Sequence, residues 1–263
     1  MPTYGAHMSF AVSANAYDRF MGRYSGPLAT VFADFAGVEA GQRVLDVGCG
    51  PGALTAELVR RTGAHAVAAV DPSASFVAAM RERYPDVDVQ QATAEAIPHP
   101  AATFEAAIAQ LVVHFMTDPV AGLGEMARVT RPGGTVAACV WDYEGGTGPL
   151  CVFWEAVRRT DPAAPGEAGM AGAREGHLAE LMRSAGLLDV VDGSVAVTVE
   201  HATFDEWWEP FTFGVGPAGV YTASLSPDAH ERLRETCREL QPTPPFAVRA
   251  TAWAARGVVP PTR

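Results

Sequence analysis

The sequence predicts an α/β fold in which helices cover a mostly parallel sheet, and three observations support this prediction. Short apolar runs alternate with helical patterns between residue 43 and about residue 140, as they do in βα units. A glycine-rich turn at residues 48–52 separates the first apolar run from the first helical pattern. A chain of 263 residues, 48% of them hydrophobic, is also long enough to bury one large core.

The individual elements follow from the local pattern of apolar residues. Apolar runs of about four to eight residues between turn residues predict strands, and longer segments with helical periodicity predict helices. The Tyr84–Pro85 pair ends one helix, and the Arg131–Gly134 stretch is a turn because it holds proline and glycine. We expect strands at 43–47, 66–70, 87–91, 106–110, 135–140, 188–199 and 246–259, and helices at 53–61, 73–83, 122–129, 150–159, 177–184, 204–211 and 227–240.

The chain is expected to form one domain rather than two. It contains no internal repeat and no linker long enough to divide it, so residues 1–263 are treated as a unit. Residues 1–38 are a helical segment that precedes the first strand. The segments 142–182 and 200–244 mix helical patterns with loops rich in glycine, proline and alanine, and we expect both to lie over the carboxyl ends of the strands.

Charge and composition exclude several classes of partner. Thirty acidic against nineteen basic residues give a net charge of −11, and the basic residues are scattered, so nucleic acid is not expected as a substrate. No apolar run approaches the roughly 18 residues of a membrane span, and Met1–Phe10 lacks the pattern of a secretory signal. We therefore expect a cytoplasmic protein. Its basic residues are all arginine, which fits a GC-rich, bacterial coding sequence.

A metal site is not predicted. The four cysteines show no paired spacing of the kind that binds zinc. His177, His201 and His230 are too scattered along the chain to suggest a shared ligand set.

The most informative segment is the glycine turn after the first strand. Glycines let the backbone approach a ligand closely, and the N-terminus of the following helix offers N–H groups. Asp71, twenty-one residues after Gly50, ends the second strand and can accept both hydroxyls of a ribose. Gly48, Gly50 and Ala53 also satisfy the dinucleotide pattern G-x-G-x-x-G/A, so these residues alone leave the cofactor open. Asp46 favours a cationic ligand over a pyrophosphate, because it places a negative charge beside the turn.

Four motifs together resemble those of class I S-adenosylmethionine-dependent methyltransferases. They are Val44–Gly52 (VLDVGCGPG), Val70–Ser73 (VDPS), Ala94–Pro98 (AEAIP) and Ala127–Gly134 (ARVTRPGG), in the family's order and spacing. The resemblance covers roughly residues 15 to 140 and is greatest to the small-molecule branch (methyltransferase type 11), which includes enzymes that act on quinone-like precursors. It implies a Rossmann-like seven-stranded sheet in the order 3-2-1-4-5-7-6, with helices on both faces and an antiparallel last strand.

The resemblance also implies the contacts of S-adenosylmethionine and of its product, S-adenosylhomocysteine. The glycine turn would lie against the methionine part and the ribose, Asp46 would hold the ammonium directly or through water, and Asp71 would take the ribose hydroxyls. Thr93 stands where the family often has an aspartate for the adenine amino group. The full set of expected cofactor residues is Tyr17, Arg23, Asp46, Gly48, Gly50, Gly52, Asp71, Pro72, Thr93, Ala94, Glu95 and Gln110.

The segment Ala16–Ser25 resembles the lid helix of these enzymes. Arg23 would then bind the methionine carboxylate, and Tyr17 would close over the ligand. The alternative is an amphipathic helix that packs its aromatic face on the core.

Methyl transfer needs an aligned acceptor, exclusion of water and, for some acceptors, a general base. His114 follows the fourth strand and is the candidate base, because histidine titrates near neutral pH; the alternative is a packed or capping histidine. Trp141, Asp142 and Tyr143 follow the fifth strand and are candidate substrate contacts, although Asp142 could equally form a turn. Trp208 could line a pocket, or pack in the core and in a homodimer contact.

Three functional classes remain in competition. The first is methyl transfer to oxygen, nitrogen or carbon of a small-molecule metabolite, including natural-product biosynthesis. The second, a nicotinamide-dependent oxidoreductase with a Tyr-x-x-x-Lys site, conflicts with the absence of lysine. The third is a protein that binds S-adenosylmethionine without methyl transfer, as a cyclase or a binding module, and its cofactor pocket would look the same.

Overall fold

The computed structural model describes residues 14–164 and 166–261, so the expected structure of residues 1–13, with the Met1–Phe10 segment, lies outside the described residues. One seven-stranded sheet has the order β3-β2-β1-β4-β5-β7-β6, which confirms the expected topology. β1 to β5 are parallel, and β7 is antiparallel to both β5 and β6. The strands are β1 (Val44–Val47), β2 (Val67–Asp71), β3 (Asp88–Gln91), β4 (Phe104–Gln110), β5 (Thr130–Trp141), β6 (Leu188–His201) and β7 (Phe246–Val258).

The expected turn at Arg131–Gly134 lies inside β5 as an irregularity of the strand. Thr130 pairs with Phe104 and the next pair joins Thr135 to Ala106, so four residues of β5 lie opposite one residue of β4. The stretch is not helical, as expected, but it does not end the strand.

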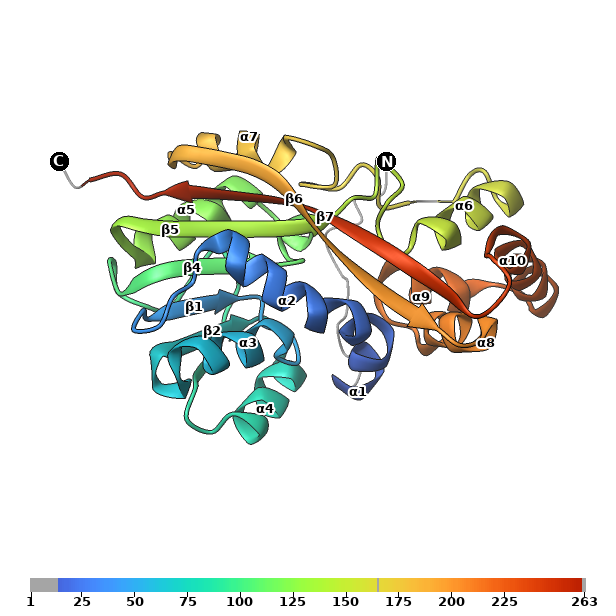
Figure 1. The fold of residues 1–263 in the computed structure, drawn as a ribbon, viewed down its shortest axis with the longest axis horizontal. Helices are drawn as coiled ribbons and strands as arrows, with labels where there is room; N and C mark the ends of the chain where they lie inside the picture. Colours follow the sequence, from blue (N-terminus) through green and yellow to red (C-terminus); the bar gives the residue numbers. More distant parts are fainter. Residues whose placement is uncertain (1–13, 165, 262–263) are drawn as a thin grey trace.

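Helices on both faces of the sheet bury two apolar layers (Figure 1). Successive residues of β1 alternate between them: Val44 belongs to the layer under α2 and α3, and Leu45 to the layer under α5 and α7. The helices that flank the sheet are α2 (Arg23–Ala36), α3 (Ala53–Thr62), α4 (Ala74–Arg83), α5 (Pro119–Val129) and α7 (His177–Ser184). Before α2 the chain forms α1 (Ala14–Tyr17) and a π-helical turn, η1 (Asp18–Gly22).

The β6–β7 hairpin continues beyond the carboxyl end of β5. Trp141 at the end of β5 pairs with Ala252, whereas β6 and β7 stay paired as far as His201 and Phe246. Figure 1 shows this extension reaching the small helices that lie to one side of the main sheet. The chain between residues 201 and 246 therefore leaves and re-enters the sheet beyond the carboxyl ends of the parallel strands.

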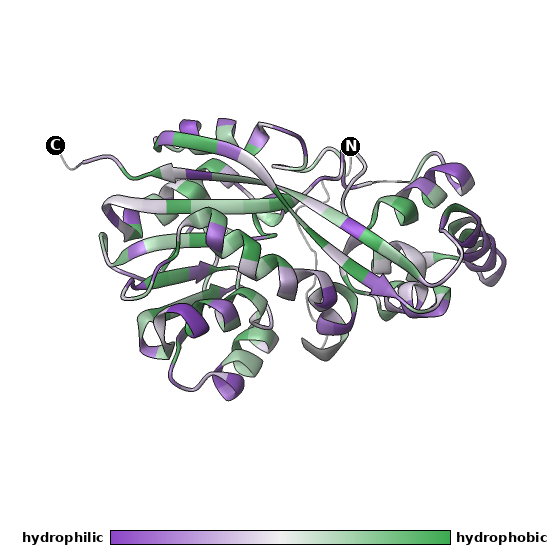
Figure 2. Cartoon of the chain, viewed as in Figure 1, coloured by the Kyte–Doolittle hydropathy of each residue, from purple (hydrophilic) through white to green (hydrophobic). Residues whose placement is uncertain are grey.

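A group of helices lies at this end of the molecule. It consists of α6 (Cys151–Thr160), α8 (Phe204–Trp208), the 3-10 turn η4 (Glu209–Phe213), α9 (Gly216–Ser224) and α10 (Pro227–Leu240). α10 packs on α6 and is mostly hydrophilic, with only Leu233 and Cys237 buried (Figure 2). α7, by contrast, packs on β6, β7 and α5, so the last part of the 142–182 segment lies on a sheet face.

α9 was not expected from the sequence. It begins Gly-Pro-Ala-Gly, a composition typical of a loop, although proline is favoured in the first turn of a helix. No described helix is both long enough and apolar enough to cross a membrane.

Candidate active site

The glycine turn between β1 and α3 is shaped by its close packing. Gly48 has φ +72°, and a Cβ there would lie 2.5 Å from Cγ2 of Val112, so no other residue fits without movement. Gly50 has φ +51°, and a Cβ there would have nothing within 4 Å, so this residue faces open space. The turn is thus packed on one side and open to a ligand on the other.

The N–H groups of the turn itself donate to acceptors within the protein. Pro51 has no N–H group, and the other turn residues donate to nearby acceptors. A pyrophosphate needs such donors, so the turn does not form a phosphate-binding nest. Gly48 and Cys49 donate to the carbonyl of Val70 (2.8 and 3.1 Å), Gly50 to Oδ2 of Asp71 (2.9 Å) and Gly52 to the carbonyl of Cys49 (3.0 Å).

Asp46 lies under the turn, with 1% of its surface exposed. Its Oδ2 accepts from the hydroxyl of Thr55 (2.6 Å), and its carboxyl group also accepts from the backbone N–H of Thr55. Burial raises the pKa of Asp46 to about 7. An acidic side chain therefore already occupies the N-terminus of α3, where a dinucleotide phosphate would bind. A contact of Asp46 with the ligand's ammonium remains a prediction.

Asp71, at the end of β2, joins the glycine turn to α4. Its Oδ2 accepts from Gly50 N (2.9 Å) and its Oδ1 from Ser73 N (2.8 Å). Burial raises the pKa of Asp71, and the two backbone donors oppose this shift. A carboxylate has about four acceptor sites, so two remain for the hydroxyls of a ribose.

The residues expected near the adenine are only partly oriented toward a ligand. Thr93 is exposed and Ala94 is buried, whereas the carbonyl of exposed Pro72 accepts from Gln91. Glu95 holds the loop before α5, because its Oε1 accepts from the N–H groups of residues 117 and 118 (2.8 and 3.3 Å). The side chain of Glu95 therefore stabilises the loop before α5 in this structure.

Gln110, at the end of β4, offers an unfilled acceptor. Its Nε2 donates to the carbonyl of Ser25 (2.9 Å). Its Oε1 is buried and has no partner among the described residues. Buried polar atoms are rarely left unpaired, so this oxygen fits a ligand that brings a donor, such as an ammonium group.

Arg23, which was expected to bind the methionine carboxylate, contacts protein groups in this structure, and its contact with a ligand stays a prediction. Its Nη1 lies 3.1 Å from Nδ1 of His201 and 3.6 Å from Oε1 of Glu206, and it donates to the carbonyl of Glu206 (3.3 Å). His201 in turn lies 2.9 Å from the hydroxyl of Tyr24. Arg23 therefore fixes α2 to the end of β6 and to α8.

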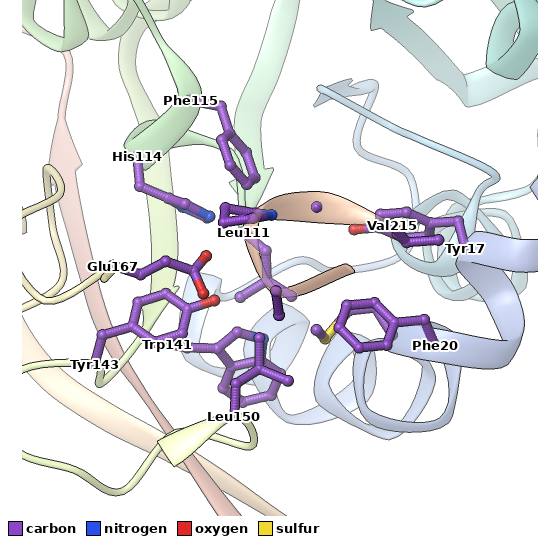
Figure 3. A pocket seen from close by; sticks show the side chains of 14 residues that line it. Tyr17, Phe20, Leu111, His114, Phe115, Trp141, Tyr143, Leu150, Glu167 and Val215 are labelled. Atoms are coloured by element: carbon purple, nitrogen blue, oxygen red, sulfur yellow. The ribbon is translucent and has the colours of Figure 1, made fainter. Parts of the chain in front are cut away.

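Tyr17 lies between α4 and a cavity at the carboxyl ends of β4 and β5. Its ring packs edge-on against Phe76 of α4, with the centroids 5.6 Å apart. The same side chain lines this cavity (Figure 3). Burial and the nearby Asp71 raise the pKa of its hydroxyl above the usual range.

This cavity, which we call the inner cavity, is the candidate acceptor site. It lies at the carboxyl ends of β4 and β5, and aromatic and aliphatic side chains form most of its wall (Figure 3). Apolar walls with a few polar groups are typical of small-molecule sites. The lining residues are Tyr17, Phe20, Met21, Leu111, His114, Phe115, Trp141, Tyr143, Leu150, Glu167, Val215, Gly216, Pro217 and Ala218.

His114 lines the inner cavity as expected, but its basicity does not fit the expected role. Its ring lies 3.9 Å from that of Phe115 and is 7% exposed. Burial lowers its pKa to about 3, because nothing nearby compensates the desolvated imidazolium. The Nδ1 atom has no hydrogen-bond partner among the described residues. A group with this pKa is a poor proton acceptor at neutral pH.

The three residues after β5 have different roles. Trp141 and Tyr143 line the inner cavity. Asp142 does not; its Oδ1 accepts from the N–H of Gly145 (2.7 Å) and from Nε1 of Trp253 (3.0 Å), and its Oδ2 accepts from a threonine hydroxyl. Asp142 is therefore a buried turn-forming residue, which is the alternative that its sequence position also allowed, and its contact with a substrate stays a prediction.

Trp208 does not line the inner cavity. It is 4% exposed, stacks on Phe204 with the centroids 6.2 Å apart and meets His230 edge-on. Trp207 is equally buried and lines a separate small cavity. Both tryptophans are buried because the chain turns from α8 into η4, which surrounds them with aromatic side chains. The aromatic packing of Trp208 fits the alternative of a core residue, and its contact with a substrate stays a prediction.

Sequence reasoning missed Glu167. This carboxyl group lies in the loop between α6 and α7, is 3% exposed and lines the inner cavity. It accepts from Nε1 of Trp154 (2.6 Å) and from the hydroxyl of Tyr143. No local signal marks it, because it stands in a stretch of glycine, proline and alanine. Among the described residues, no group of three acidic, histidine or cysteine side chains could hold a metal ion.

Comparison with known proteins agrees with this geometry. Residues 44–134 match the family of methyltransferase domains. An uncharacterized methyltransferase of Mycobacterium tuberculosis is 36% identical over 135 residues, which are 51% of this chain and 52% of that protein. A demethylmenaquinone methyltransferase of Mycobacterium sp. (strain KMS) is 41% identical over 103 residues, 39% of this chain and 43% of that protein. The matches thus span about half the length of these relatives.

Likeness to a solved structure extends over almost the whole chain. The structure is a complex of the Haloferax volcanii Trm112 methyltransferase activator with a methyltransferase, and it matches with a TM-score of 0.60 and 20% identity. The match covers 95% of this chain and 96% of that chain, and at this identity it shows the fold. Family match, sheet order and glycine turn therefore agree: residues 44–134 match a methyltransferase domain, and the seven-stranded sheet has the order expected from the resemblance to class I S-adenosylmethionine-dependent methyltransferases.

Proposed function

We propose that this protein transfers the methyl group of S-adenosylmethionine to a small, largely apolar molecule. The observation that carries the proposal is the position of the inner cavity, whose wall includes Tyr17, beside α4, and Leu111, the residue after Gln110. An acceptor in this cavity would lie next to the cofactor residues. The largely apolar wall of the inner cavity is typical of sites for small molecules.

The chain's own residues would hold the cofactor in a defined way. Asp71 has acceptor sites left for ribose hydroxyls, and Gly50 leaves room for close approach of the ligand. The unpaired Oε1 of Gln110 would accept from the ammonium group. S-adenosylmethionine supplies an electrophilic methyl group when bound; the protein aligns the acceptor and excludes water.

The acceptor class follows from the walls of the inner cavity. Five of its lining residues carry aromatic side chains, namely Tyr17, Phe20, Phe115, Trp141 and Tyr143, which suit a planar molecule. One relative is named for a demethylated quinone, and a quinone-like or phenolic natural product fits the same walls. The net charge of −11 disfavours nucleic acid, and the cytoplasm remains the expected location.

Calorimetry and product analysis test this proposal. S-adenosylmethionine and S-adenosylhomocysteine should bind in the micromolar range, with NAD failing to compete, and S-adenosylhomocysteine should form when a suitable acceptor is added. Asp71→Ala should weaken cofactor binding by about 1.5–3 kcal/mol, because ribose hydroxyls lose a charged acceptor. Asp86→Asn, at an exposed loop position, is the control and should have no effect.

Two outcomes would contradict the proposal. Tighter binding of NAD than of S-adenosylmethionine would refute the cofactor. Binding of S-adenosylmethionine without formation of S-adenosylhomocysteine across a broad panel of phenols, quinols and amines would favour the alternative, a cyclase-like protein or a binding module.

A further inference from the structure

Glu167 separates the inner cavity from a second cavity nearer to the surface. This outer cavity measures about 290 Å³ and is bounded by the loop after β5, by α6 and by the loop that follows α6. Tyr143 and Glu167 line both cavities. Figure 3 shows the carboxyl group of Glu167 directed toward the interior of the inner cavity, between His114 and Tyr143. The side chain thus contacts the acceptor space on one side and a route to solvent on the other.

Two hydrogen bonds fix the orientation of this carboxyl group. Nε1 of Trp154 donates to Oε2 (2.6 Å), and the hydroxyl of Tyr143 donates to the same carboxyl group. Both donors are themselves buried, Trp154 to 6% and Tyr143 to 9% exposure. Glu167 therefore cannot turn away from the inner cavity without leaving a buried donor unpaired, which costs about 1–3 kcal/mol.

The groups that face Glu167 leave it without a cationic partner. Within the described residues it forms no ion pair, and Arg158, which lines the outer cavity, pairs with Glu155 instead (2.6 Å). The other titratable groups around it are Tyr143 and Glu144 from the loop after β5, His114 from the 3-10 turn η3 (Val113–Phe115), Tyr17 from α1 and Cys151 from α6.

These groups differ in their ability to take a proton near neutral pH. Burial raises the pKa of the Tyr17 and Tyr143 hydroxyls and of the Cys151 thiol, so they stay protonated. His114 stays neutral but is a poor base, with a pKa of about 3. Burial raises the pKa of Glu167 to about 7, which is the range in which a carboxylate is an effective proton acceptor.

We propose that Glu167 binds the O–H or N–H group of the acceptor and takes its proton during methyl transfer. This inference rests on the proposed function and narrows it to oxygen or nitrogen acceptors. The acceptor atom forms a bond to the methyl carbon, the methyl–sulfur bond breaks with its electron pair left on sulfur, and the acceptor's proton passes to the carboxylate of Glu167. The outer cavity then gives this proton a path to solvent.

The first test needs no acceptor. Because the indole of Trp154 donates to Glu167, ionisation of this carboxyl group should change tryptophan fluorescence, with a midpoint near pH 7 in the wild-type protein. Glu167→Gln should abolish this transition while keeping an acceptor for Trp154. Glu175→Gln removes the same charge from an exposed position in the following loop and should leave the transition intact. A transition that persists in Glu167→Gln would overturn the assignment.

The second test uses a panel of simple phenols and aromatic amines, with formation of S-adenosylhomocysteine as the signal. For any acceptor that the wild type methylates, Glu167→Gln should lower kcat about 10²-fold and remove the acidic limb of the pH–rate profile. The affinity for S-adenosylmethionine should stay within about threefold, and Glu167→Asp should restore part of the rate. An unchanged kcat in Glu167→Gln would refute the role.

Failure of the proposed function gives a different result. A wild-type protein that shows the fluorescence transition but methylates none of the panel refutes methyl transfer to these acceptors, and the proton-transfer step with it. Methylation of a phenol with no loss in Glu167→Gln refutes only the role of Glu167.

Discussion

The carboxyl group of Asp46 accepts a hydrogen bond of 2.6 Å from the hydroxyl of Thr55, across the glycine turn that separates them in sequence. Both residues are almost fully buried, with exposures of 1% and 0%. The contact ties the end of β1 to the first turn of α3, so it fixes the two ends of the turn against which a nucleoside would lie. Three of the four predictions below depend on buried polar groups of this kind.

Thr55→Val should destabilise the protein by about 1–3 kcal/mol, because it leaves the buried carboxyl group of Asp46 without its hydroxyl donor. Valine keeps the shape of threonine, so packing is little changed. Urea denaturation measures the effect. Thr55→Ser keeps the donor and should lose less than half as much; an equal loss in both variants would mean that packing, not the hydrogen bond, is responsible.

Asp46 should also make stability depend on pH. Its pKa is raised from 3.8 to about 7, so the folded state keeps a proton that the unfolded chain loses at lower pH. The contribution of this bound proton to the free energy of unfolding is therefore complete below about pH 4 and is lost as the pH rises through 7. The buried histidines His114 and His201 have lowered pKa values and act in the opposite direction. The contribution of Asp46 is therefore measured as the difference in stability between the wild type and a variant that lacks this carboxyl group.

The free energy of unfolding of Asp46→Asn, relative to that of the wild type, should accordingly rise by on the order of 2–3 kcal/mol as the pH is raised from 5 to 8. Urea denaturation of both proteins, without ligand, at several pH values gives this difference. A difference that does not change with pH would show that Asp46 is ionised throughout the range.

Arg23→Ala should leave the affinity for S-adenosylmethionine within about threefold. The guanidinium is already engaged by His201 and Glu206, so its loss should appear as a lower Tm. Arg19→Ala removes a neighbouring exposed arginine, paired with Glu209 at 3.0 Å, and should change neither property by much. A loss of cofactor affinity above about tenfold in Arg23→Ala would instead restore Arg23 as a ligand of the methionine carboxylate.

His114→Ala should lower kcat by less than about tenfold and leave the pH–rate profile unchanged between pH 6 and pH 8. The reason is the pKa of about 3, which keeps the imidazole neutral and weakly basic over this range. Steady-state kinetics with any acceptor found active provides the measurement, with His65→Ala at an exposed position as the control. A loss of about 10²-fold would identify His114 as the base in place of Glu167.

The parts of the structure that could be predicted are those where local pattern and topology act together. Alternating apolar runs determine the strands, and right-handed crossovers leave few orders for the parallel part of the sheet. α9 was missed because Gly-Pro-Ala-Gly resembles a loop, and only packing on η4 makes it helical. The helical propensity of such a segment is too weak to reveal it.

In the candidate site, too, residues set by local spacing could be predicted and residues set by contacts between distant segments could not. Asp71 follows a strand at a fixed distance from the glycine turn, so its place could be inferred from spacing. The role of Asp142 depends on Trp253, which is 111 residues away, and the position of Glu167 depends on Trp154 and Tyr143. Contacts between such distant segments leave no periodic signal in the sequence.

The last paired residues of the β6–β7 hairpin, His201 and Phe246, have a broader consequence. The 44 residues between them start and finish on adjacent strands, so the sheet is affected only at these two positions. Insertions or new helices between residues 202 and 245 could therefore arise without a change in the strands and the glycine turn of residues 44–110. Because residues 215–218 of this stretch line the inner cavity, exchange of residues 202–245 between relatives should change the wall of that cavity, provided that the donor segment restores a partner for Arg23.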